Sequence, residues 1–309
     1  MIGVTLKHLR YFAALARREH FGDAASDCGI SQPALSQQMR EFEAQLGASL
    51  IERGGRRIRL TPLGREIAAR AQAILQAVDD LRDLARGSTG PMGGRLRLGI
   101  IPTVAPYLLP AIMKEAVTQL PDLSLQPLEA RTSRLIAELG DGRLDAAIVA
   151  LPISEPGLHE ERLFAEEFML VRHRTDASEP APSSERLRTM RLLLLEEGHC
   201  FRDQALAFCD LSGPEATREL MEGSSLTTLV QMVGAGLGVT LIPQMAVAQE
   251  ARTADVSVAA LPHPRPSRTL GLIWRRTTPM AEPLRKFAKV LLDAHARASM
   301  GANLRTNTD

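Results

Sequence analysis

The chain has 309 residues, of which 45% are hydrophobic and 24% are charged, and these globular proportions exclude disordered and collagen-like classes. The length suits about two domains. Aromatic residues account for only 4%, which argues against a stacked-aromatic surface for single-stranded nucleic acid. The net charge is only +1, but residues 1–90 carry 13 Lys and Arg against 10 Asp and Glu, which favours contact of this part of the chain with nucleic acid.

The first helices follow the pattern of a helix-turn-helix. Apolar residues recur at helical spacing over residues 5–18, and a short helix is expected over about 22–28. A second helix should begin at Gln32 or Pro33, after a tight turn containing glycine, and end at Leu46. Two short helices joined in this way are typical of DNA-binding proteins.

The second of these helices would present a polar face near its amino end. Ser31 is a natural N-cap. The apolar residues expected to pack inward are Ala34, Leu35, Met39, Phe42 and Leu46. The candidates for contact with base edges in a major groove are Ser31, Gln32, Pro33, Ser36, Gln37 and Arg40. A solvated helical hairpin is the alternative.

The next segment predicts a wing beside the helices. Gly54 and Gly55 would form a turn between two short strands. Arg53, Arg56 and Arg57 cluster there, and cationic side chains in this position suit contacts with DNA phosphates. A solvated hairpin is again the alternative.

A long helix is predicted from Thr61 to about Arg86, followed by a glycine-rich linker over 87–94. Its roughly 22 residues would span about 33 Å. Apolar residues alternate in steps of four and three, which predicts a seam for dimerisation. The seam residues are Ile67, Ala71, Ile74, Val78, Leu81 and Ala85. Packing onto the same chain is the alternative.

Several short motifs occur together in this head. They are Leu9-Arg10-Tyr11-Phe12, Ala24-Ala25, Ser31-Gln32-Pro33-Ala34-Leu35-Ser36, Leu46-Gly47 and Leu60-Thr61-Pro62-Leu63-Gly64. In this combination the head resembles the LysR-type transcriptional regulators. The resemblance implies a winged helix-turn-helix over residues 1–62, a dimerisation helix over 63–90 and a regulatory body over 91–309.

Strands and helices alternate after the linker, which predicts an α/β body with parallel strands. We expect two Rossmann-like subdomains, similar to those of periplasmic binding proteins, over about 95–168 plus 269–300 and about 169–268. A ligand would bind beyond the carboxyl ends of strands. The hydroxyl residues expected at such ends are Thr103, Thr132 and the pair Ser224-Ser225, with ordinary N-capping as the alternative for each. The individual strands expected are 95–103, 123–130, 144–151, Phe168–His173, 191–197, 239–243 and 269–274, and the last helix is expected over 280–297.

Residues 192–209 stand apart because they place two cysteines on one predicted helix. Cys200 would open that helix, where the helix N-terminus and Arg202 favour a thiolate. On one continuous helix, the Cα atoms of Cys200 and Cys209 would be about 13.5 Å apart, whereas a disulfide tolerates roughly 4.4–6.8 Å. A bond between them would require local refolding, which is the behaviour of a redox switch. Two buried free thiols are the alternative.

The body carries further motifs of one branch of the same family. They include Glu197-Gly198-His199-Cys200, Arg202-Asp203-Gln204-Ala205, Phe208-Cys209, Ile101-Pro102-Thr103-Val104 and Glu129-Ala130 with Thr132. With these the chain resembles the hydrogen-peroxide-sensing LysR-type regulators. The resemblance implies Cys200 as the peroxidatic thiol and Cys209 as the resolving thiol. It also implies that Thr103, Thr132, His199, Arg202 and Asp203 hold or polarise peroxide.

The same resemblance implies partners. These are promoter double-stranded DNA, a homodimer or homotetramer of the chain, RNA polymerase, and a thioredoxin or glutaredoxin system as reductant. The loop at residues 172–185 and the tail after Ser299 do not match, which leaves oxidation sensitivity and target genes open.

Composition and motifs also set limits. No signal peptide, membrane span, metal-ligand cluster or cofactor loop is predicted, and three cysteines do not make a disulfide framework. We therefore expect a cytoplasmic protein without cofactor or metal, in which Cys28 has a packing role. A LysR-type regulator responding to a small metabolite is the alternative function. A thiol peroxidase is less favoured, because a DNA-binding head has no use in an enzyme.

Overall fold

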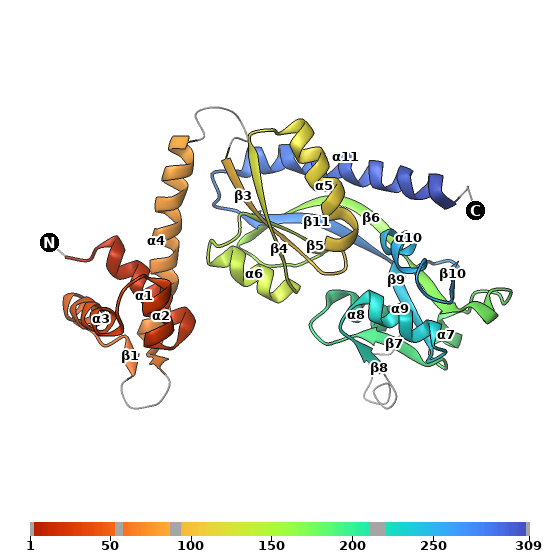
Figure 1. Cartoon of the computed structure of the whole chain (residues 1–309), viewed down its shortest axis with the longest axis horizontal. Helices are drawn as coiled ribbons and strands as arrows, with labels where there is room; N and C mark the ends of the chain where they lie inside the picture. The colour runs from red at the N-terminus through yellow and green to blue at the C-terminus, as the bar shows by residue number, and fades with distance from the viewer. Residues whose placement is uncertain (1–2, 53–57, 87–93, 210–220, 307–309) are drawn as a thin grey trace. The chain divides into compact units, whose positions relative to one another are not determined.

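The computed structural model describes residues 3–52, 58–86, 94–209 and 221–306 (Figure 1). The chain divides into two compact units. One contains residues 1–89, and the other begins at Gly90 and contains nearly all of the remaining chain. None of the described helices is both long enough and apolar enough to cross a lipid bilayer.

The first unit is a winged helix-turn-helix followed by a long helix, as predicted. Its elements are α1 (Leu6–Arg18), α2 (Phe21–Asp27), α3 (Gln32–Leu46), β1 (Ile51–Glu52), β2 (Arg59–Leu60) and α4 (Pro62–Arg86). Strands β1 and β2 pair antiparallel and form the base of the wing. The predicted turn at Gly54 and Gly55 lies outside the described residues. So do the three candidate wing arginines, Arg53, Arg56 and Arg57.

Local capping fixes the limits of α3. The Ser31 hydroxyl accepts a hydrogen bond from the Ala34 amide at 3.4 Å, so the predicted N-cap is present. Gly47, with a φ of 64°, ends the helix in the left-handed conformation that glycine adopts without strain. Leu35, Met39 and Phe42 are buried and Leu46 is partly buried, as expected. The inward packing expected for Ala34 is wrong, because this first-turn residue is exposed.

Close packing at its first turn anchors α4 to the unit. The Thr61 hydroxyl donates to the Ser49 carbonyl oxygen and accepts from the Gly64 amide at 2.9 Å. A Cβ atom on Gly64 would lie 2.2 Å from the Leu50 carbonyl oxygen, so only glycine allows this approach. These contacts give a physical reason for the Leu-Thr-Pro-Leu-Gly motif.

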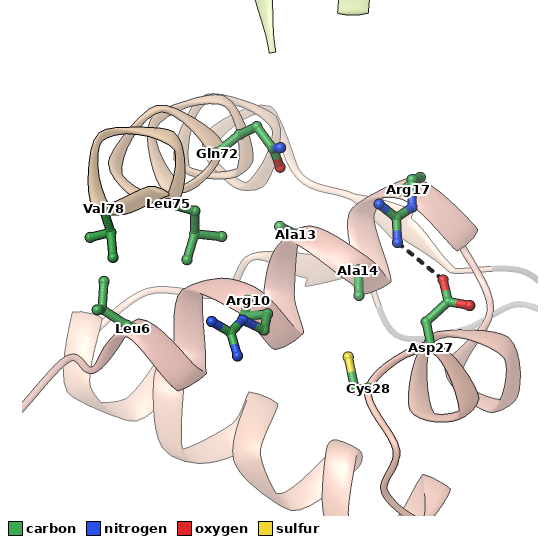
Figure 2. A pocket seen from close by; sticks show the side chains of 10 residues that line it. All are labelled: Leu6, Arg10, Ala13, Ala14, Arg17, Asp27, Cys28, Gln72, Leu75 and Val78. Carbon is green, nitrogen blue, oxygen red and sulfur yellow. Dashed lines mark hydrogen bonds and ion pairs between the residues drawn. The ribbon is translucent and has the colours of Figure 1, made fainter. Parts of the chain in front are cut away.

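The predicted apolar seam of α4 is divided between two surfaces. Ile67 and Ala71 pack into the core formed with α1, so the same-chain alternative holds for the first half. Val78 lies opposite Leu6 of α1 (Figure 2). The side chains of Ile74 and Leu81 are instead 47% and 65% exposed. The seam prediction therefore concerns Ile74 and Leu81, and the Ala85 side chain lies outside those described.

The body alternates strands and helices, which confirms the α/β prediction. Among the described residues, nine strands form one mixed sheet in the order β4-β3-β5-β11-β6-β9-β7-β8, with β10 paired to β6. The elements are β3 (Gly94–Ile100), α5 (Ala105–Gln119), β4 (Leu123–Glu129), α6 (Thr132–Gly140), β5 (Ala146–Leu151), β6 (Leu158–His173), η2 (Arg174–Asp176), α7 (Ser184–Leu187), β7 (Leu192–Leu195), α8 (Cys200–Phe208), β8 (Met221–Gly223), α9 (Leu226–Gly234), β9 (Val239–Pro243), η3 (Gln244–Ala246), α10 (Val247–Glu250), β10 (Val256–Ala260), β11 (Ser267–Arg275) and α11 (Ala281–Thr306).

The strands of this sheet contribute to two separate hydrophobic cores. Lobe 1 comprises β3–β5, α5, α6, β11 and α11, and lobe 2 comprises β7–β10 with α7–α10. The strands β3, β4 and β5 are parallel, and so are β7, β8 and β9. Helix α5 packs against α11 at the same side of lobe 1 (Figure 1). The late strand and final helix thus rejoin the first lobe.

Strand β6 joins the two lobes. Its residues up to Glu167 pair with β11, and its residues from Phe168 pair with β9. The expected strand began only at Phe168, which was wrong by ten residues. Five charged side chains between Glu160 and Glu167 hid the apolar alternation of the first half. The short strands β8 and β10 were also missed.

Placing charges on the exposed part of the α4 seam should weaken self-association, since a carboxylate in a helix–helix interface must be desolvated. We expect the double variant Ile74→Glu, Leu81→Glu to shift to monomer in light scattering coupled to gel filtration. The matched control is Arg70→Glu on the same helix, whose native side chain is 75% exposed. An unchanged molar mass in the double variant would contradict a seam at these residues.

Candidate functional site

A small cleft lies where three strands of the body end. Thr103 follows β3, Thr132 opens α6 after β4, and Cys200 opens α8 after β7. The free space is about 180 Å³ when the part open to solvent is counted, and it leaves no room for a whole water molecule in this conformer. The lining residues are Ile101, Pro102, Thr103, Arg131, Thr132, Gly198, His199 and Cys200. The structure therefore brings four of the predicted site residues together, and it does so between lobe 1 and lobe 2.

Three other candidates lie outside the residues that line this cleft. The Arg202 guanidinium is buried and donates to the Leu195 carbonyl oxygen at 2.9 Å and to Glu222 Oε1 at 2.6 Å. The side chain of Asp203 is exposed. Cys209 follows the other end of α8. A role for Arg202 and Asp203 at peroxide stays a prediction.

Thr132 brings an unsatisfied polar atom to the cleft. Its hydroxyl oxygen is buried and has no hydrogen-bond partner among the described residues. A buried polar atom without a partner costs free energy, and a ligand atom that formed a hydrogen bond with this oxygen would remove that cost. In contrast, Ser225 caps α9 through the Thr228 amide, so the capping alternative holds there.

A buried ion pair between Arg268 and Glu166 contacts Thr103, and the sequence analysis did not predict it. Arg268 on β11 lies 2.6 Å from Glu166 on β6, and the two side chains are 0% and 4% exposed. Arg268 also donates to the Thr103 hydroxyl oxygen at 2.7 Å and to its carbonyl oxygen at 3.1 Å. Because that hydroxyl already accepts a hydrogen bond from a cation, its own proton is free to be donated to a ligand.

The same arginine reaches the second lobe. Its guanidinium carbon lies 5.4 Å from the centroid of the Phe201 ring, next to Cys200. Phe201 in turn packs against Phe168 at 4.7 Å between ring centroids. The signal in the sequence was Arg268, which directly precedes the strand expected over 269–274. It faces Glu166 only once the strand register is known.

His199 is held neutral at ordinary pH. Burial lowers the pKa of His199 below its usual value, and the positive charge of Arg131 adds to this effect while Glu196 opposes it. A neutral imidazole offers one donor and one acceptor nitrogen. At the edge of the cleft it can therefore donate or accept a hydrogen bond.

The two thiols of α8 lie in different surroundings. Cys200 is partly buried against the core of lobe 1, and Cys209 is completely buried in the core of lobe 2. Burial raises the pKa of Cys209 to about 11. Residues 200–208 are helical, so the two Cα atoms are separated by about 13.5 Å, well beyond disulfide reach. This conformer is a dithiol form.

The third cysteine lies in the first unit. Cys28 borders a groove formed by α1, α2 and α4, beside the ion pair of Arg17 with Asp27 (Figure 2). Burial raises the pKa of the Cys28 thiol. Its side chain packs against the core of this unit, which agrees with the expected packing role.

Helix α3 presents a polar surface. Ser31, Gln32, Pro33, Gln37 and Arg40 are exposed, and Ser36 is half-buried. Gln37 Nε2 donates a hydrogen bond along the helix to Glu41 Oε1 at 3.0 Å. The exposed residues occupy the amino-terminal half of the helix, which is the part that enters a major groove in helix-turn-helix complexes. Within the described residues, no group of three His, Cys, Asp or Glu side chains could hold a metal ion.

The contrast between the two α8 thiols predicts selective alkylation. In reduced protein at pH 8, iodoacetamide should modify Cys200 at least tenfold faster than Cys209, because Cys209 is buried and its pKa near 11 leaves little thiolate. Peptide mapping by mass spectrometry measures both rates. In denaturant the difference should disappear. Equal rates in the folded protein would contradict the environment described for Cys209.

Comparisons with known proteins agree with the two-part architecture. Residues 6–65 match the bacterial regulatory helix-turn-helix family of LysR type, and residues 89–296 match the LysR substrate binding domain. A probable hydrogen peroxide-inducible genes activator of Mycobacterium avium is 41% identical over 93% of both chains. The regulator EstR of Acinetobacter baylyi is 39% identical over 89% of this chain and 92% of its own.

Solved structures give the same result. The Corynebacterium glutamicum OxyR structure of a cysteine-to-serine variant with hydrogen peroxide bound is 36% identical. It covers 98% of this chain and 96% of its own, with a TM-score of 0.69. The chain thus belongs to the LysR family of bacterial helix-turn-helix regulators, and within it to the hydrogen-peroxide-sensing OxyR group.

Proposed function

We propose that this regulator senses hydrogen peroxide by reversible formation of a disulfide between Cys200 and Cys209, and thereby controls oxidative-stress genes. The observation that carries the proposal is one small cleft in which Cys200 meets Thr103, Thr132 and His199. Cys209 lies nine positions after Cys200 in the chain and is buried. A reactive thiol, polar groups for a small ligand and a second thiol are what such a sensor needs.

The polar groups at the cleft suit a very small polar effector. Thr103 has a hydroxyl proton to donate, Thr132 has an unsatisfied oxygen, and neutral His199 can donate or accept. The amino end of α8 carries partial positive charge toward Cys200. Once the cleft opened to admit it, these groups would hold peroxide with one oxygen facing the sulfur.

The proposed chemistry has two steps. The Cys200 thiolate attacks one peroxide oxygen, the O–O bond breaks, and the leaving hydroxide takes a proton to become water. The resulting sulfenic acid is then attacked by the Cys209 thiolate, which forms the S–S bond and releases a second water. A dithiol reductant of the thioredoxin or glutaredoxin type would return both sulfurs to thiols.

The second step requires a change of fold. The helical path of α8 keeps the Cα atoms about 13.5 Å apart, and a disulfide needs roughly 4.4–6.8 Å. The disulfide and the helix over residues 200–208 are therefore mutually exclusive. We infer that oxidation unfolds this helix, and that the rearranged lobe changes how the assembled heads lie on promoter DNA.

We propose three working parts: a DNA-binding head over residues 1–62, a dimerisation helix over 63–90 and a redox-sensing body over 91–309. Two heads would bind two half-sites of double-stranded DNA, as a homodimer or within a homotetramer. RNA polymerase is the proposed partner at the promoter, and the cytoplasm the proposed location. The thiols serve as a switch and not as an enzyme in turnover.

A metabolite-binding regulator is the second candidate, which the match of residues 89–296 to the LysR substrate binding domain favours. The size of the cleft argues against it. The cleft must open to admit any effector, because it leaves no room for a whole water molecule in this conformer. A drug-sized molecule needs about 300–1,000 Å³, so peroxide requires far less opening. The peroxide proposal therefore explains the dimensions better.

One equivalent of hydrogen peroxide should convert the reduced protein to a Cys200–Cys209 disulfide. Peptide mapping before and after treatment measures this conversion. In Cys209→Ser the sulfenic acid on Cys200 should persist long enough to be trapped with dimedone. In Cys200→Ser neither product should form.

The matched control is Cys28→Ser, which keeps both α8 thiols and should behave as wild type. Unmodified Cys200 in the wild-type protein under these conditions would overturn the peroxide proposal. It would leave the metabolite-sensing regulator as the better account.

The polar face of α3 should carry DNA recognition. Duplexes selected by the protein from a random pool serve as the probe. A good side-chain contact to a base edge is worth about 1–3 kcal/mol, so Arg40→Ala should weaken binding by at least about fivefold. Arg70→Ala, which removes an exposed cation from α4, is the control. Equal affinities for Arg40→Ala and wild type would show that Arg40 does not contact DNA.

A further inference from the structure

Arg131 holds the turn that leads into Cys200. This residue of lobe 1 immediately precedes α6, and its guanidinium donates to the Glu197 carbonyl oxygen and to Glu196 Oε2, both at 2.8 Å. Both acceptors belong to the turn between β7 and α8 in lobe 2. One planar side chain thus contacts the turn at two points, which a guanidinium can do because its donors form a fork.

The turn also lies against the stem of the arginine. Gly198 has a φ of 89°, and a Cβ atom placed on it would be 3.3 Å from Arg131 Cδ. Glycine is suited to both conditions, since it adopts positive φ freely and leaves room for a neighbour. The close approach and the two hydrogen bonds together form what we call the Arg131 clamp, made by Arg131 with Glu196, Glu197 and Gly198.

We propose that the Arg131 clamp positions the turn before Cys200 in the dithiol conformer and slows disulfide closure relative to oxidation of Cys200. This inference rests on the proposed two-thiol switch. Arg131 is a positioning residue, because its guanidinium hydrogen bonds go to the turn. It would set how much sulfenic acid accumulates before the switch completes.

The argument follows from what each step has to move. Attack on peroxide takes place with Cys200 at the start of an intact α8, so the clamp can stay closed. In the closure step the Cys209 sulfur must reach Cys200 and displace hydroxide, which leaves as water. That step requires the start of α8 to leave its position, and residues 196–198 lie directly before it. Contacts present in the dithiol conformer and broken on closure raise the closure barrier.

The size of the effect should be modest. The side chains of Arg131 and Glu196 are 42% and 45% exposed, and exposed ion pairs contribute little because water screens them. The second hydrogen bond, to a main-chain oxygen, adds to the pair. We expect the ratio of closure rate to Cys200 oxidation rate to rise about two- to fivefold when the clamp is removed.

Two rates in the full-length protein test this proposal. Cys200 oxidation is followed with hydrogen peroxide in a Cys209→Ser background by rapid quenching with dimedone. Closure is followed with both cysteines present, by acid quenching and mass spectrometry. Arg131→Gln should raise the ratio of the two rates two- to fivefold, and Glu196→Gln should raise it less. The double variant should do no more than Arg131→Gln, because both remove one set of contacts.

Two matched variants complete the design. Arg134→Gln makes the same chemical change three residues later on α6, at a side chain that is 64% exposed and pairs along the helix with Glu138. It should leave the ratio at the wild-type value. Arg131→Lys keeps the charge but not the fork, and should give an intermediate ratio. The equilibrium between dithiol and disulfide, measured against a glutathione buffer, should shift toward disulfide by a similar factor in Arg131→Gln.

A wild-type ratio in Arg131→Gln would overturn the clamp. So would equal changes in both rates, since these would assign Arg131 to the reaction with peroxide itself. Failure of the wild-type protein to form sulfenic acid or disulfide would overturn the proposed function instead. A full shift in Arg134→Gln would also overturn the clamp, because the effect would then follow the charge of α6 and not the contacts of Arg131.

Discussion

Helix α8 keeps the two thiols of the switch apart, and the body is organised around that separation. Cys200 opens the helix against lobe 1, and Cys209 follows its end within the core of lobe 2. The first thiol therefore meets the cleft while the second is hidden from it. The helix is also held between these ends, because Phe201 and Ala205 are buried in lobe 2. Any oxidised form must give up part of this packing, so the dithiol fold itself opposes closure.

The cleft between the lobes depends on charges that water does not reach. Arg268 and Glu166 form an almost completely buried pair that supports Thr103 and lies beneath Phe201. Removing two ions from water is costly, and pairs of this kind seldom raise stability above that of apolar side chains. Their contribution is better understood as geometry: the pair joins β6, β11, the loop after β3 and the start of α8 in one fixed arrangement. Arg131 adds an exposed counterpart at the rim of the cleft.

Local signals explain what could be predicted from the sequence. The Ser31 cap, the glycines at 47 and 64 and the alternation of strands with helices are all encoded over a few residues, so the head and the α/β class were predictable. Thr103, Thr132 and His199 could be expected at one site because each follows a strand or opens a helix, although the resemblance supplied their roles. Arg268 and Glu166 are separated by 102 positions, so only the strand register brings them together. Which residues of the α4 seam pack into the core and which stay exposed likewise depends on where α1 lies.

The return of β11 and α11 to lobe 1 has a consequence for how the chain is made. Trp274, Phe287 and Leu291 are completely buried in the core of lobe 1, yet they are synthesised after every strand of lobe 2. During translation the first core therefore lacks its largest side chains until the last forty or so residues emerge, while lobe 2 is already complete in sequence. The apolar faces of β5 and α5 must stay exposed or be sheltered by chaperones throughout that interval. Early termination anywhere before β11 would leave an intact DNA-binding head attached to a body that cannot close its first core.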